Sequence, residues 1–492
     1  MSCRSATCAL ALVATMGLAV GVHADVPTPE ITGPITSPGS AFVGGTTSFD
    51  LTEVGYEQAE YFIAGTASAY VNTGPLGTDG VWPVEPGETA DYRTRIVVYR
   101  PTDPKKFSGT VFVEWLNVSG GVDAGPDWTQ GHVEMIRQGA AWVGVSAQYV
   151  GVEGGPPLVG VISLPLKDVN PARYGSLNHP GDSFCLDMFS QAGQAIRSPS
   201  PSGANPLGTL TPKRVIAIGE SQSAFKLTQY VNAVHPLAQV YDGFLIHSRG
   251  GLSITPLSEA PQPAIVPPGN AIIREDVDVP VLIFQTESDI TFLQYFSARQ
   301  DDSKRVRLWE IAGTAHYDTY GLSIGPADLG TSPDIAAIIS DLTAPIPGII
   351  ECATPINSGP QHYVLNAALD KLVRWVKTGK APKSAPRLDA NAGPPVTFNV
   401  DEHGNALGGI RTPWVDAPIA TFTGTQAGSI LCMLFGSTTA FDDAKLASLY
   451  PTHKAFTKAY EKSLKRAVKK GWILKPDAKL IKQWAAESGV GG

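Results

Sequence analysis

Long apolar runs alternate with segments of helical spacing through the middle of the chain. The runs are GTVFVEWLN (109–117), AAWVGVSAQ (140–148), RVIAIG (214–219), YDGFLIHS (241–248) and VPVLIFQ (279–285). They lack the alternation of a half-exposed strand, so we expect parallel strands buried on both faces. Helical spacing fills 127–139, with a capping Asp127 and a closing Gly139, then 183–197, and then 223–235, which Pro236 ends. The pattern predicts an α/β fold, a mostly parallel sheet with helices on both faces.

Two long intervals interrupt this pattern after predicted strands. Residues 149–182 and 249–278 are rich in Pro and Gly and carry no regular period. Loops of such length in a compact domain are usually lids or binding loops. We therefore expect lid-like insertions over the carboxyl edge of the sheet, where the active sites of open α/β sheets lie.

The last part of the chain has a helical pattern of its own. The stretch HKAFTKAYEKSLKRAVKKGW (453–472) places five apolar side chains near one helical face and lysines on the opposite face. The apolar residues are Phe456, Tyr460, Leu464, Ala467 and Trp472. This pattern predicts a helix that docks on the rest of the protein. The expected organisation is a signal peptide at 1–24, an extended arm at 25–48, a core domain at 49–388, and a C-terminal extension at 389–492 packed on that domain.

The N-terminus has the layout of a secretory signal peptide. Arg4 precedes an apolar stretch, and small residues follow it up to Ala24. We expect cleavage after Ala24 and a secreted or periplasmic protein. The apolar stretch is short for a membrane span, and no second run in the sequence reaches spanning length.

Composition narrows the range of partners. The 45 Asp and Glu residues outnumber the 37 Lys and Arg residues, and the resulting net charge of −8 disfavours nucleic acid. The sequence has no H-E-x-x-H, no C-x-x-C pair and no phosphate-binding loop with its lysine, so we expect neither a metal nor a cofactor. Cys185, Cys352 and Cys432 remain after signal removal, enough for one disulfide and one leftover thiol, with the pairing open.

The stretch VIAIGESQSAF (215–225) carries a serine from the end of a buried strand into a helix. Gly219 and Ser223 stand two positions before and after Ser221, where a nucleophile elbow requires small residues. Ser223 replaces the second glycine of that motif and is still small. A serine hydroxyl is a poor nucleophile near neutral pH without a general base. Ser221 therefore indicates nucleophilic catalysis only if the chain also supplies a general base and an acid that orients it.

Candidates for both follow later strands of the same sheet. His316 lies on a loop after the strand-like segment 307–311, and we predict it to be the base. After the strand that ends at Gln285, the sequence TESD offers two acids. The length of the turn favours Asp289, and Glu287 is the alternative. The order serine, acid, histidine along the chain fits a catalytic triad.

An oxyanion site needs two backbone N–H groups aimed at the attacked carbonyl oxygen. One candidate is the amide of Gln222, at the start of the helix after the serine. The other is expected in the loop after 109–117, from Asn117 or Val118. Glu220, beside the nucleophile, and His247, at the end of its strand, are further candidates for the pocket.

Seven stretches together resemble one known family: YRTRIVVYRP, GTVFVEWLNVSGG, AWVGVSAQYVGVEG, RYGSLNHPGDSFCLDMFSQ, GESQSAF, EIAGTAHYD and GNALGGIRTPWVD. They are similar to exported α/β-hydrolase-domain proteins over nearly the whole mature chain. The resemblance implies an α/β-hydrolase fold and a serine hydrolase, with an esterase as the expected activity. It implies catalytic roles for Ser221, His316 and one of the two acids.

These patterns predict an exported carboxylic-ester hydrolase that cleaves a small-molecule ester through Ser221, Asp289 and His316. Two alternatives stay open. One is an acyltransferase or C–C bond hydrolase that uses the same site. The other is a binding protein that keeps the fold without turnover. The acyl and alcohol groups and the oligomeric state do not follow from the sequence.

Overall fold

The structure is a computed structural model, which describes residues 25–159, 163–200, 203–252, 256, 265–337, 339 and 341–492. The predicted signal peptide at 1–24 lies outside the described residues. So do residues 253–255 and 257–264 of the second lid-like interval at 249–278. The first interval holds three short helices, α2, α3 and α4, so it is partly structured.

A nine-stranded sheet forms the centre of the described part of the chain, in the order β1-β2-β3-β5-β4-β6-β7-β8-β9. The strands from β5 to β9 in this order run parallel, whereas β1, β2 and β3 pair antiparallel. The bounds are β1 (Glu30–Thr32), β2 (Tyr56–Asn72), β3 (Val84–Pro101), β4 (Thr110–Trp115), β5 (Ala141–Val145), β6 (Arg214–Glu220), β7 (Gly243–His247), β8 (Val281–Gln285) and β9 (Val306–Glu310). The predicted parallel core is confirmed.

Helices follow most of the parallel strands, and short two-stranded pairs occur towards the C-terminus. The helices are α1 (Pro126–Arg137), α2 (Tyr149–Glu153), α3 (Leu166–Val169), α4 (Pro171–Tyr174), α5 (Cys185–Arg197), α6 (Gln222–Gln229), α7 (His235–Ala238), α8 (Glu287–Thr291), α9 (Gln361–Thr378), α10 (Pro413–Asp416), α11 (Ile430–Phe435), α12 (Asp443–Leu449), α13 (His453–Lys470) and α14 (Lys475–Glu487). The pairs are β10 (Ala390–Asn391) with β11 (Thr397–Phe398), and β12 (Ala420–Thr423) with β13 (Ser437–Ala440).

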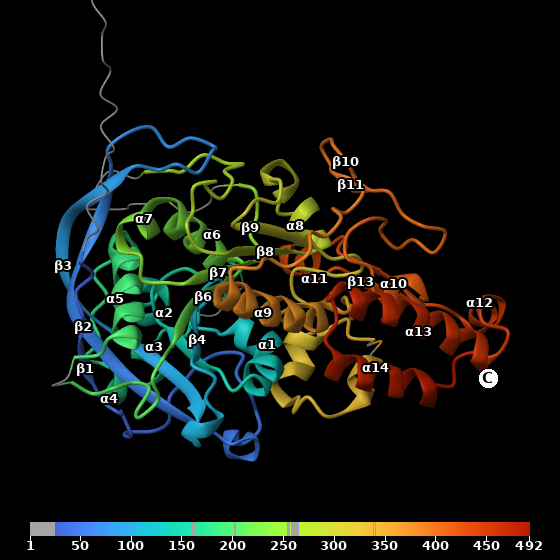
Figure 1. Cartoon of the computed structure of the whole chain (residues 1–492), viewed down its shortest axis with the longest axis horizontal. Coiled ribbons are helices and arrows are strands. Elements are labelled where there is room, and N and C mark those ends of the chain that lie inside the picture. The colour runs from blue at the N-terminus through green and yellow to red at the C-terminus, as the bar shows by residue number, and fades with distance from the viewer. Residues whose placement is uncertain are drawn as a thin grey trace, which may run out of the picture.

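Helices cover both faces of the large sheet (Figure 1). Helices α1 and α9 share one apolar cluster with Phe112 of β4, and α5 and α6 share another with Val113. Successive side chains of a strand point to opposite faces, so this strand is buried on both sides. That burial explains why the central strands are continuously apolar in sequence.

Two long strands form the antiparallel edge of the sheet. Strands β2 and β3 have 17 and 18 residues and pair along their whole length. Figure 1 shows this curved hairpin at one end of the molecule, with α13 and α14 at the opposite end. The catalytic candidates lie on neither hairpin strand and come from the parallel part of the sheet.

Two helix boundaries differ from the predictions. Asp127 is not the cap of α1, because the helix begins at Pro126 and Gly125 holds the cap position. Pro236 does not end the helix after the elbow. That helix passes through a π-helical turn, Tyr230–Val234, into α7, and Pro236 occupies the first turn of α7. The carbonyl of Asn232, four positions before Pro236, accepts a hydrogen bond from Arg274 at 2.9 Å in place of the N–H that proline lacks.

The predicted C-terminal helix is α13. Phe456, Tyr460, Leu464 and Ala467 are buried together in one apolar cluster with residues of α14. Trp472 follows the end of the helix and packs instead in the cluster beneath α9. The boundary that we placed at residue 389, between core and extension, stays a prediction.

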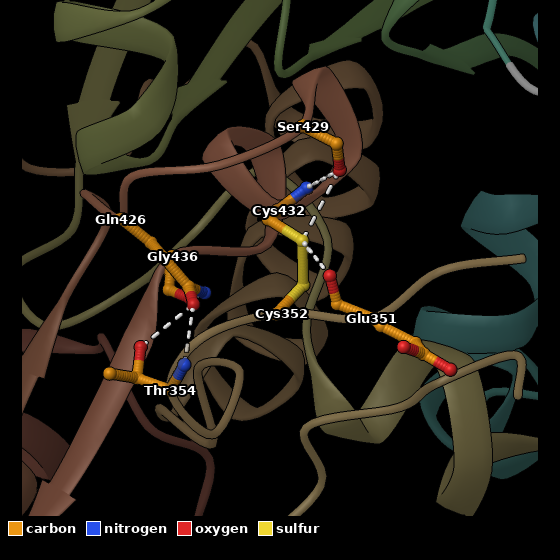
Figure 2. Close-up of a disulfide and its surroundings, with 7 residues drawn as sticks. All are labelled: Glu351, Cys352, Thr354, Gln426, Ser429, Cys432 and Gly436. Carbon is orange, nitrogen blue, oxygen red and sulfur yellow. Dashed lines mark hydrogen bonds between the residues drawn. A yellow bond between two sulfur atoms is a disulfide. The ribbon is translucent and has the colours of Figure 1, made fainter. Parts of the chain in front are cut away.

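A disulfide joins Cys352 to Cys432 across 80 positions of sequence (Figure 2). It ties the loop before α9 to α11. Beside it, the side-chain oxygen of Gln426 accepts hydrogen bonds from the amide and hydroxyl of Thr354. Cys185 is buried in α5.

Candidate active site

Ser221 lies between β6 and α6 in a backbone conformation that side chains rarely adopt, with φ 60° and ψ −120°. Its N–H donates to the carbonyl oxygen of His247 on the neighbouring strand at 2.9 Å. A Cβ atom on Gly219 would stand 3.0 Å from Leu227 and 3.1 Å from Ser223, so only a small residue fits there. Strained turns of this kind present the hydroxyl above the edge of the sheet.

The structure brings His316 to Ser221. The ring lies on the loop after β9, and its Nε2 is 2.8 Å from Ser221 Oγ. The backbone N–H of His316 donates to the hydroxyl of Ser288 at 3.2 Å. That hydroxyl in turn donates to the carbonyl of Gly424 at 2.7 Å. The histidine is thus held by α8 and by a C-terminal loop together.

Asp289 lies on the other side of the same ring. Its Oδ1 is 2.6 Å from His316 Nδ1, and the carboxylate is completely buried. Its Oδ2 accepts hydrogen bonds from the amide and the hydroxyl of Thr286, which form a capping box at the start of α8. The carboxylate is therefore fixed by its own helix terminus and has one oxygen available for the imidazole.

Glu287, the alternative acid, points elsewhere. Its carboxylate accepts the N–H groups of Gly313 at 2.6 Å and Gly424 at 2.8 Å. Burial raises the pKa of Glu287 to about 7. Its contacts are structural, and Asp289 alone of the two meets the imidazole.

Two of the three candidate oxyanion donors have a backbone N–H that is available to a ligand, and the third does not. The amides of Gln222 and Val118 donate to no protein acceptor among the described residues. The amide of Asn117 donates to the carbonyl of Ala124 at 2.8 Å. Asn117 therefore cannot supply the second donor, and Val118 is the remaining candidate in that loop. The Asn117 side chain instead donates to the carbonyl of Glu220 at 3.0 Å, which braces the elbow.

Glu220 and His247 lie next to each other at the ends of β6 and β7. Glu220 Oε1 is 3.3 Å from His316 Nε2. Burial raises the pKa of Glu220 to about 7, opposed by the two histidines. Burial lowers the pKa of His316, but the Glu220 and Asp289 carboxylates outweigh it, so the net direction is upward.

Sequence reasoning missed the partner of His247. Its Nδ1 lies 2.8 Å from Oδ1 of Asp127, inside α1, and both residues are fully buried. Gln361 on α9 contacts the other ring nitrogen at 3.2 Å. The available signal was an acid at the start of a helix expected to pack on the sheet, and we interpreted Asp127 as a helix cap.

A cavity of about 800 Å³ lies between α8, the β10–β11 loop and α11. Phe292, Phe296, Val396 and Met433 are among its lining residues, and none of the described residues in its wall is charged. Neither Ser221 nor His316 contributes to its wall. The cavity is therefore mainly apolar and is separate from the hydrogen-bonded residues Ser221, His316 and Asp289.

Two further findings concern the described residues alone. None of their helices has both the length and the apolar character of a membrane span. No group of three or more of their His, Cys, Asp or Glu side chains is arranged to hold a metal ion.

Sequence comparison decides the family. A family model described as "Alpha/beta hydrolase domain" matches residues 31–483. The chain belongs to the alpha/beta hydrolase domain family. The order of the parallel strands and the elbow after β6 agree with that membership. Among curated proteins, none matches this chain.

Solved structures of this fold class resemble the alpha/beta hydrolase chain only remotely. Est1E from Butyrivibrio proteoclasticus, solved with ferulic acid, is 11% identical, with 48% of this chain and 92% of that chain covered and a TM-score of 0.29. A serine hydrolase without a lid from Xanthomonas campestris is 12% identical, with 51% and 86% covered and a TM-score of 0.26. A fungal esterase from Rhizomucor miehei is 10% identical, with 50% and 74% covered and a TM-score of 0.25.

Proposed function

We propose that this alpha/beta hydrolase is a serine esterase that cleaves small-molecule carboxylic esters. The observation that carries the proposal is the continuous contact from Ser221 Oγ through His316 to Asp289, at 2.8 and 2.6 Å. A serine becomes a useful nucleophile when a positioned base takes its proton and an acid orients that base.

The geometry supports acyl transfer in two stages. Ser221 Oγ attacks the ester carbonyl while its proton moves to His316 Nε2, and the Asp289 carboxylate holds the Nδ1–H side of the ring. The imidazolium then gives its proton to the departing alcohol, which leaves Ser221 acylated. Water, activated by the same ring, releases the acid. The free amides of Gln222 and Val118 are the proposed donors to the oxyanion.

Export is a further part of the proposal. The N-terminal signal pattern motivates it, and the Cys352–Cys432 disulfide supports it, because such bonds persist in oxidising compartments. Intact mass of the protein recovered outside the cytoplasm should correspond to a chain that starts at Asp25. A full-length chain found only in the cytoplasm would contradict export.

The activity test combines labelling with turnover. A fluorophosphonate should modify Ser221, identified by peptide mass, and p-nitrophenyl esters of increasing chain length should be hydrolysed. Ser221→Ala should lose the label and at least about 10³-fold in kcat. Ser223→Ala, two positions along in α6, is the matched control and should keep both.

Each contrary outcome identifies an alternative. Intact esters and no adduct on folded protein would favour a binding protein. An adduct with little hydrolysis, together with products formed from an added alcohol or from a β-diketone, would favour an acyltransferase or a C–C bond hydrolase. Esterase activity retained by Ser221→Ala would overturn the assignment.

A further inference from the structure

His316 faces a carboxylate on each of its two ring nitrogens. Asp289 lies on the Nδ1 side at 2.6 Å. On the Nε2 side, Glu220 Oε1 lies at 3.3 Å, while Ser221 Oγ lies at 2.8 Å from the same atom. The Glu220 and His316 side chains are each only 5% exposed, so bulk water screens this contact poorly.

The side chain of Asn117 and the backbone of the elbow hold Glu220 in this position. Its backbone carbonyl accepts the Asn117 amide, and its Oε2 lies 3.5 Å from the same amide nitrogen. It is the residue directly before the nucleophile, so the strained elbow at Ser221 also fixes its direction. Its Oε1 has no hydrogen-bond partner among the described residues, and it lies within ion-pair distance of the His316 ring.

Other charged and titratable groups surround this contact from several elements. His247 on β7 and Asp127 on α1 influence Glu220, and Asp289 on α8 adds negative charge. Tyr317, next to His316, is affected by Glu220, Asp318 and Glu114, and its pKa is raised by burial. When protonated, the two histidines are the positive counterparts of a group of buried carboxyls.

The two protonation states of His316 respond differently to Glu220. A neutral ring with its proton on Nδ1 presents a lone pair at Nε2, which offers a carboxylate no hydrogen bond. An imidazolium presents an N–H there and a positive charge, which a carboxylate at 3.3 Å stabilises. Only interactions that are stronger in the transition state than in the ground state accelerate a reaction.

We propose that Glu220 is a positioning residue that stabilises His316 in its protonated form while Ser221 is being acylated. This inference rests on the proposed function. The proton leaves Ser221 Oγ as the bond from Oγ to the acyl carbon forms. It stays on Nε2 beside Glu220, and passes to the alcohol oxygen as the bond from the acyl carbon to that oxygen breaks. Glu220 keeps its charge and transfers no proton.

Glu220→Gln tests the proposal because it removes the charge and keeps the shape. The acidic limb of kcat/KM against pH should move to lower pH by about one unit or more, since an opposite charge at this range shifts a pKa by about 1–3 units. The plateau should fall by about tenfold. The control is Glu134→Gln, a buried carboxyl on α1 paired with Arg137, which should leave the limb in place.

A second readout does not depend on ester turnover. Histidine-labelled protein gives the titration of His316 by NMR, and Glu220→Gln should lower its midpoint by the same amount. An unchanged midpoint would overturn the proposal, even if activity fell. Absence of any ester hydrolysis or phosphonate adduct in the wild type would instead overturn the proposed function.

Asp289→Asn provides a second test of the role of Glu220 if Glu220→Gln does not fold. In that variant Glu220 is the one carboxylate still in contact with the ring. The His316 midpoint in Asp289→Asn should then be higher than in Asp289→Asn combined with Glu220→Asp, which withdraws the remaining carboxylate by one methylene. Equal midpoints in these two variants would contradict the stabilising role of Glu220.

Discussion

At the scale of residues, the triad geometry predicts unequal effects for the two acids near His316. Asp289→Asn should reduce kcat by about 10³- to 10⁴-fold, because the new amide would donate to Nδ1 and leave the proton on Nε2, where the base must be free. Steady-state kinetics on a p-nitrophenyl ester measures the loss.

Glu287→Gln is the comparison. It should change kcat/KM by less than about tenfold and destabilise the fold by about 1–3 kcal/mol, because a buried N–H of Gly313 or Gly424 loses its acceptor. An equal loss of kcat in the two variants, at equal folded fraction, would count against Asp289 as the acid.

The three triad candidates could be predicted from the sequence because their order along the chain and their positions after strands are both restricted by the fold. Ser221, Asp289 and His316 each follow a strand of one parallel sheet, and such strand ends meet at one edge. The choice between Asn117 and Val118 was not predictable, because it depends on a turn in which Asn117 pairs with Ala124. The His247 and Asp127 contact joins residues 120 positions apart on different elements.

At the scale of elements, the disulfide encloses α9 and the β10–β11 pair. Replacing both cysteines, as Cys352→Ser with Cys432→Ser, should lower the free energy of unfolding by about 2–4 kcal/mol, because a loop of this length gains much entropy when it is no longer closed. Urea titration of the double variant against the wild type measures the change. An unchanged unfolding midpoint would contradict it.

Element types were more predictable than element ends. The apolar runs became β4 to β8 because strands buried on both faces need apolar residues throughout. Strands β2 and β3 lack such a continuous apolar pattern, because part of each strand is exposed. Pro236 looked like a stop, yet a π-helical turn places it in the first turn of α7, which local propensity does not reveal.

At the scale of the whole molecule, buried titratable groups set the dependence of stability on pH. Burial is the first cause that raises the pKa of Glu134, Glu287 and Asp318 to about 7. A carboxyl with a raised folded pKa gives stability that is present below its unfolded value and is lost as pH rises through the folded value. The free energy of unfolding should therefore increase as pH falls from about 7.5 to about 5, as measured by denaturant titration.

His362 acts in the opposite direction and supplies the control. Its ring stacks on Tyr320 at 3.7 Å, and burial lowers its pKa to about 3. The unfolded chain therefore gains a proton there on acidification that the folded chain does not, which reduces stability. His362→Phe keeps the stack and should steepen the gain in stability towards acid pH. A flatter slope would contradict this sign.

The hydrogen bond from Ser288 to the carbonyl of Gly424 links the helix that carries Asp289 to the C-terminal part of the chain. The same hydroxyl receives the N–H of His316, and Glu287 holds the amide of Gly424. Residues 389–492 are therefore part of the support on which the triad is built. A gene truncated at the predicted boundary would encode a histidine loop without its anchor, and selection on catalysis would act on both segments together.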